Sequence, residues 1–73
     1  MAKRAILTGV VVSFDDAAGL GVVRGEDGSE LPFHCTAIAD GTRSIQEQAR
    51  VHYSVVPGRA GRFEANDLHP ASG

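Results

Sequence analysis

The sequence has one cysteine, no tryptophan and no long hydrophobic run. The lone thiol, Cys35, cannot form an internal disulfide, and such cysteine usage is typical of a reducing cytoplasm, where we expect this protein to act. The chain lacks a stretch of about 18 apolar residues, so we expect no membrane-spanning helix and no membrane partner. A fold of 73 residues must therefore be held together by packing alone.

Positive charge is also scarce. Seven Lys and Arg residues stand against nine Asp and Glu residues, which gives a formal net charge of −2. No overall positive field would draw the chain to nucleic acid or anionic lipid, so any such binding must depend on a local cluster. Acidic pairs such as Asp15-Asp16 and Glu26-Asp27 lie in turn-like segments, which favours solvated turns over acid-base chemistry.

The N-terminal segment places Lys3-Arg4 before an apolar run, which is the order found in a secretory signal. No small-residue cleavage site follows, and Asp15-Asp16 interrupt the run, so we expect this segment to belong to the fold. We predict a single domain over residues 1–73, with a core from about residue 5 to 68 and a flexible tail at 69–73.

Hydrophobic residues make up 42% of the chain and charged residues 22%, as in ordinary folded proteins. Gly and Asp recur every eight to fifteen residues and separate short β-branched runs, a pattern typical of all-β proteins. Strands are predicted at about 5–14, 19–25, 30–35, 50–56 and 62–68. In the fourth, Val51, Tyr53 and Val55 would share one face. Five strands favour a small antiparallel Greek-key barrel, whose closure removes exposed edges.

The residues offer little for catalysis or for a metal. His34 and Cys35 are strand neighbours and should point to opposite faces, which disfavours both a metal site and a nucleophile–base pair. The segment Gly19-Leu20-Gly21 resembles the start of a dinucleotide fingerprint, but no third glycine or helix pattern follows. We therefore expect no enzymatic activity, no metal and no cofactor.

Four segments carry a specific resemblance. They are Gly9–Asp15 (GVVVSFD), Gly19–Val23 (GLGVV), Glu26–Gly28 (EDG) and Phe33–Ile38 (FHCTAI). In order and spacing they resemble the cold-shock domain, and the similarity covers roughly residues 6–68. The resemblance implies an OB-fold barrel that binds single-stranded RNA or DNA by stacking bases on an aromatic sheet face. It also implies a role as an RNA chaperone or a regulator of expression.

The aromatic face of the family is depleted here. Where the family has Lys-Trp-Phe, this chain has Val12-Ser13-Phe14, and Lys-Gly-Phe-Gly-Phe is replaced by Ala18-Gly19-Leu20-Gly21-Val22. Val-Phe-Val-His-Phe becomes Leu31-Pro32-Phe33-His34-Cys35, so rings remain at Phe14 and His34. Each stacked base contributes about 1–3 kcal/mol, so we expect weak binding with little sequence preference.

The expected nucleic-acid-binding residues are Phe14, Leu20, Val22, Arg24, Pro32, His34, Arg59, Arg62 and Phe63. Phe14 and His34 would stack on bases, and Arg24 shares the strand phase of the same face. Arg59 and Arg62 flank a Gly-rich loop that could reach the rim of the binding face. Alternatively, these arginines could serve only to balance the negative charge of the acidic residues. Phe63 could be an additional ring for a ligand or a lid over the core.

Three further residues are assigned by strand geometry. Phe33 and Tyr53 lie in the buried phase of their strands and are predicted to be core residues. Pro32 cannot donate to a ladder, so it must lie on an edge strand, at a bulge or at a strand's first residue.

A second function class stays open. The same face would carry an exposed aliphatic patch formed by Val12, Leu20, Val22 and Pro32. Such patches often mark protein interfaces. The alternative is therefore a protein-interaction or homodimerisation module that uses the same barrel face.

Overall fold

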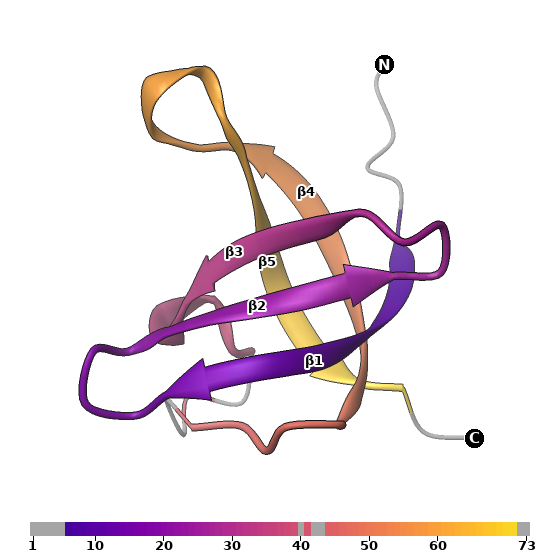
Figure 1. The fold of residues 1–73 in the computed structure, drawn as a ribbon, viewed down its shortest axis with the longest axis vertical. Coiled ribbons are helices and arrows are strands. Elements are labelled where there is room, and N and C mark those ends of the chain that lie inside the picture. The colour runs from indigo at the N-terminus through magenta and orange to yellow at the C-terminus, as the bar shows by residue number, and fades with distance from the viewer. Residues whose placement is uncertain (1–5, 40, 42–43, 72–73) are drawn as a thin grey trace.

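Five strands form one antiparallel sheet in the computed structural model, which describes residues 6–39, 41 and 44–71 apart from the side chain of Arg59 (Figure 1). The strands are β1 (Leu7–Asp15), β2 (Leu20–Gly25), β3 (Glu30–His34), β4 (Arg50–Pro57) and β5 (Phe63–Pro70). Two short 3₁₀ helices, η1 (Cys35–Ala37) and η2 (Arg59–Gly61), follow β3 and β4. The all-β, five-strand prediction is confirmed. Within the described residues no helix is long enough to cross a membrane.

The strand order is β3-β2-β1-β4-β5, so the first strand lies at the centre of the sheet. The sheet curls, and β4 and β5 pass behind β1, β2 and β3 in Figure 1. The segment after β3 meets β5 through a parallel bridge between Ile38 and Leu68 and a 2.8 Å bond from the Ala39 N–H to the Leu68 carbonyl. This arrangement matches the OB-fold expected from the sequence.

The core fills the inside of this curl. It consists of Val11, Val23, Phe33, Ala37, Ile38, Val51, Tyr53, Ala65 and Leu68. Phe33 and Tyr53 are only 1% and 2% exposed, so both predicted core aromatics are confirmed. Aliphatic and aromatic side chains from all five strands and η1 thus supply the burial that replaces disulfides in this small fold.

Two bulges change which side chains face inward. In β1 the register passes from Val11↔Val23 to Ser13↔Val22, so Val12 is an extra residue. In β4 the register shifts between His52 and Ser54, and the alternation expected for residues 51–56 ends at Tyr53.

The shift in β4 reverses the positions of the next two side chains. Ser54 is 1% exposed and its hydroxyl donates to the Asn66 carbonyl at 3.4 Å, while Val55 turns outward. The prediction that Val55 shares the buried face of Tyr53 is therefore wrong, because a bulge shifts the side-chain phase by one residue.

The C-terminal strand is longer than expected. His69 and Pro70 belong to β5, and the Ala71 N–H donates to the Arg50 carbonyl at 3.0 Å. Residues 69–71, which the sequence assigned to a flexible tail, are thus attached to β4, and the rest of that segment, 72–73, lies outside the described residues. The difference arises because pairing with β4 orders a His-Pro segment that has little strand propensity of its own.

Asp15 organises the turn between β1 and β2. Its Oδ1 accepts the N–H groups of Ala17 and Ala18 at 3.0 and 3.2 Å, and Gly19 adopts a φ of 68°. Only glycine takes that left-handed conformation without strain. The prediction that this acid serves a turn is confirmed by these contacts.

Tyr53 gives the fold a dependence on alkaline pH. Burial, and then the negative charges of Asp27 and Glu26, raise the pKa of its phenol above the ordinary value of 10.0. The unfolded chain therefore loses this proton first, so the free energy of unfolding should be unaffected by Tyr53 below about pH 10 and should fall above it. Urea unfolding at pH 9, 10 and 11 measures the effect, and Tyr53→Phe, which removes the chain's single tyrosine, should abolish it. An equal fall in Tyr53→Phe would assign the effect to another group.

Candidate nucleic-acid interface

The outer face of β1, β2 and β3 is built from three cross-strand rows. They are Asp15–Leu20–His34, Ser13–Val22–Pro32 and Val10–Arg24–Glu30. Side chains of paired residues lie on the same face of a sheet, so each row brings together residues distant in sequence. We call the surface formed by Ser13, Leu20, Val22, Pro32 and His34 the platform.

The platform is open to solvent and mostly aliphatic. Leu20 is 46% exposed, Pro32 and His34 are exposed, and Val22 is half-buried. Pro32 lies on β3, an edge strand of the sheet, so its missing N–H costs no ladder bond. The fold thus brings together four of the predicted residues, Leu20, Val22, Pro32 and His34. The His34 imidazole is the aromatic ring among them.

Phe14 does not share this surface. It pairs with Gly21, and its ring stacks on buried Phe33 with centroids 5.9 Å apart and an angle of 8° between the rings. The bulge at Val12 causes this placement, because it puts Ser13 on the outer face with Val22 and turns Phe14 toward the core. The expectation that Phe14 presents its ring beside His34 is corrected accordingly.

Val12 also leaves the expected patch. As the extra residue of the bulge it has no partner in the β2 register, and Ser13 takes the place beside Val22. Val12 instead lines a neighbouring open cleft of about 290 Å³. The lining residues of this cleft are Gly9, Val10, Val12, Arg24, Gly25, Glu26 and Gln48. The apolar patch on the platform is therefore smaller than the sequence suggested.

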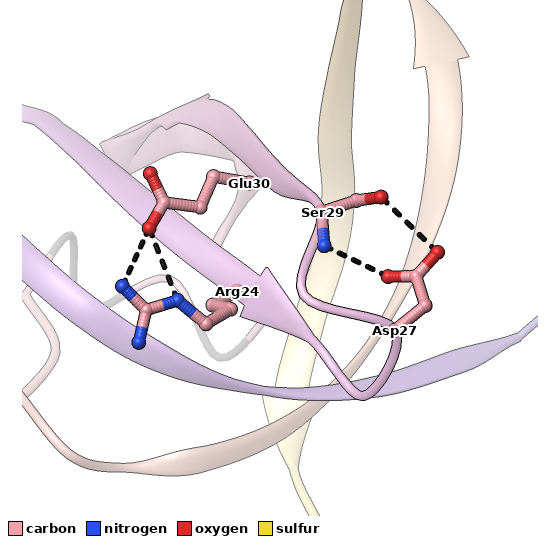
Figure 2. Close-up of polar contacts among 4 residues, drawn as sticks. All are labelled: Arg24, Asp27, Ser29 and Glu30. Carbon is pink, nitrogen blue, oxygen red and sulfur yellow. Dashed lines mark hydrogen bonds and ion pairs between the residues drawn. The ribbon is translucent and has the colours of Figure 1, made fainter.

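Arg24 lies on the predicted face but has an internal partner. Its Nε and Nη2 both donate to Oε2 of Glu30, at 3.0 and 2.7 Å (Figure 2). The two side chains are 54% and 47% exposed, and exposed ion pairs contribute only about 0–1 kcal/mol. A phosphate group could therefore displace Glu30 from Arg24 at small cost.

Asp27, also drawn in Figure 2, belongs to the turn between β2 and β3. Its carboxylate accepts the Ser29 N–H at 2.9 Å and the Ser29 hydroxyl at 3.1 Å. These two bonds, the backbone one first, lower the pKa of Asp27 from its ordinary value of 3.8. The group is thus a charged turn former and is unsuited to carry a proton near neutral pH.

The remaining predicted residues lie apart from the platform. Arg62 and Phe63 are exposed at the end of the β4–β5 hairpin, which extends beyond β3 at the top of Figure 1. Phe63 is 57% exposed, so it does not cover the core as a lid. The backbone of Arg59 begins η2, and its side chain lies outside the described residues.

The structure adds two residues at the border of the platform, Arg50 and Gln48. Arg50 on β4 is exposed and pairs with Val10, which extends the row of Arg24 by one strand. Gln48 lines the cleft beside Arg24. Arg50 could have been found from the outward phase of its strand, since Val51 is buried, but no sequence signal marks Gln48.

The expected divergence of His34 and Cys35 is confirmed. His34 is exposed on the platform, whereas Cys35 is half-buried and packs against the core. Throughout residues 6–39, 41 and 44–71, no three His, Cys, Asp or Glu side chains form a group that could hold a metal ion.

Comparison with known families matches residues 7–70 to the 'Cold-shock' DNA-binding domain. A search of curated proteins gave no significant match. The matched range includes all five strands and the whole platform. The family binds nucleic acid and has no catalytic role. On the basis of the match and of the fold, the chain belongs to the cold-shock DNA-binding domain family.

Proposed function

We propose that this protein binds single-stranded RNA or DNA weakly and with little sequence preference, using the platform and the arginines beside it. The observation that carries the proposal is the row geometry, which places exposed Leu20, Pro32 and His34 and half-buried Val22 on adjacent strands next to Arg24. Within the cytoplasm, such a protein would act as an RNA chaperone or a regulator of expression.

The binding would combine a small stacking surface with a few phosphate contacts. His34 offers a ring and Pro32 a flat apolar surface, and Leu20 and Val22 offer apolar contact. Aromatic stacking contributes about 1–3 kcal/mol per base. A platform with one imidazole therefore contributes much less binding free energy than a full set of aromatic rings would. Arg24 and Arg50, two strands apart in one row, would contact successive phosphates.

Fluorescence anisotropy of a labelled oligopyrimidine, at low and at moderate salt, tests this proposal. Two phosphate contacts should make log affinity fall with log salt at a slope of about −1.4, since each contact on a single strand contributes about −0.7. Arg24→Gln should weaken binding and reduce the slope by about 0.7. No binding at millimolar protein would overturn the proposal.

Glu30 should limit this affinity. Because its carboxylate occupies two donors of Arg24, Glu30→Gln should tighten oligonucleotide binding about threefold to fivefold and steepen the salt slope, as expected from the small cost of an exposed ion pair. Glu64→Gln on β5 is the matched control, because it removes the same charge without touching Arg24. Equal effects of both variants would show that net charge alone is responsible.

The aliphatic part of the platform supports a second candidate, a protein-interaction or homodimerisation surface. Leu20 is nearly half exposed and adjoins Val22 and Pro32, as in apolar contact sites. Sedimentation of the wild type and of Leu20→Lys and Val22→Lys tests it. A dimer that either lysine dissociates would favour this candidate, and a monomer unaffected by both would count against it.

A further inference from the structure

Gln48 has a backbone conformation that its residue type does not favour. Its φ of 73° lies in the left-handed region, where a side chain with a Cβ is strained and glycine is not. Main-chain bonds impose this conformation. The Gln48 N–H donates to the Val11 carbonyl at 2.7 Å, and the Val11 N–H donates to the Ala49 carbonyl at 2.9 Å. The segment leading into β4 is thereby held against β1 at its bulge.

Gln48 also lines the open cleft of about 290 Å³ beside the platform. Apolar Val10 and Val12 and charged Arg24 and Glu26 line the same cleft. That volume lies just below the usual range of small-ligand sites, which begins at about 300 Å³. In the described part of the chain, no protein group hydrogen-bonds the side-chain amide of Gln48. Strained residues often occur where function requires a particular side chain.

Given the proposed nucleic-acid binding, on which this step rests, we propose that the cleft receives one unpaired nucleobase of the bound strand. Adenine would be preferred at this single position, while the rest of the strand is bound with little sequence preference. Arg24 links the two surfaces, because it lies in a row beside the platform and also lines the cleft. A strand whose phosphate meets Arg24 would place its next base over Val10 and Val12. There the side-chain amide of Gln48 would present both a donor and an acceptor, which match the amino group and ring nitrogen of adenine. The Glu26 carboxylate accepts a second amino hydrogen. Cytosine offers the same pair on a smaller ring that covers less of the apolar lining, and uracil has no amino group.

Gln48→Gly separates this role from a structural one. Glycine adopts the left-handed backbone without strain, so the fold should become more stable. The melting temperature should rise by roughly 4–8 °C, which is the shift expected in a domain of this size when one strained residue is relieved. Loss of the amide should weaken binding of an oligoadenylate about fivefold to tenfold and leave an oligouridylate nearly unchanged. A residue present only for stability would not show a gain of stability together with a loss of binding.

Ala60→Gly is the matched control. Ala60 has a φ of 57° in the β4–β5 connection, so glycine should stabilise the fold there while oligoadenylate affinity stays within about twofold. A Gln48→Gly variant that keeps both the affinity and the adenine preference would overturn the proposed subsite. If the wild type binds neither oligonucleotide, the proposed function itself is overturned, which is a distinct result.

Discussion

Leu20→Phe together with Val22→Phe should tighten single-stranded oligonucleotide binding roughly 25-fold. Both side chains lie on the platform, in the rows of His34 and Pro32, and Leu20 is 46% exposed, so a ring can be added without entering the core. A stacked base contributes about 1–3 kcal/mol relative to alanine, and replacing an aliphatic residue should give about 1 kcal/mol per ring. Anisotropy titration at fixed salt measures the gain, and the salt slope should not change, because no phosphate contact is added.

The control for this gain is a double variant that adds the same number of rings at other exposed positions. Ile6 and Val55 are 57% and 36% exposed and lie off the platform, so Ile6→Phe with Val55→Phe adds two rings elsewhere. It should change affinity less than about twofold. A gain equal to that of the platform variant would mean that added hydrophobicity, rather than stacking on this face, increases binding. No gain from the platform variant would remove this face from the proposed site.

Gly21→Ala should destabilise the fold by about 3 kcal/mol, near the upper end of overpacking costs. Gly21 lies in the row between Phe14 and Phe33, and the two rings stack across it. An added Cβ would lie 2.5 Å from Cζ of Phe33 and 2.8 Å from the Ser13 carbonyl oxygen. Neither neighbour can move away easily, because the Phe33 side chain is only 1% exposed and the Ser13 oxygen belongs to the backbone. The melting temperature should fall by roughly 12–24 °C in a thermal scan.

Gly58→Ala is the control for that loss. Its added Cβ would also approach other atoms, at 2.5 to 2.7 Å, but all of them belong to the end of the Glu64 side chain, which can move away. We expect the free energy of unfolding to change by less than about 0.5 kcal/mol. If the two alanine variants lost equal stability, the ring stack over Gly21 would not be the cause.

The local signals of the sequence were sufficient for the elements of the fold. Turn residues such as Asp15 and Gly19 depend on bonds to near neighbours in the chain, and β-branched runs between them mark the strands. The motif Gly19-Leu20-Gly21 also indicated the family, since spacing survives where the rings do not. Pro32 could be restricted to an edge strand, a bulge or a strand's first residue because it has no N–H to donate, and the structure has it on an edge strand.

Reasoning from local signals failed where the face of the sheet on which a side chain lies depends on how its strand pairs with the neighbouring strands. Phe14 was expected on the outer face and Val55 on the inner, and both predictions were reversed by a bulge. An inserted residue shifts every later side chain of its strand to the other face, and periodicity within one strand cannot reveal it. The ion pair of Arg24 with Glu30 was equally invisible, because it depends on the register between β2 and β3.

The sequence by itself determined that this chain forms a small β-sheet of the cold-shock type, with a platform poor in rings and no excess of positive charge. The tertiary structure decided which residues make up that surface: it turned Phe14 inward, gave Arg24 an internal carboxylate, and brought Gln48 and Arg50 to its border. The physical reason is one of range. Backbone preferences act between neighbours in the chain, whereas a binding face is assembled by hydrogen-bonded register between strands far apart in sequence.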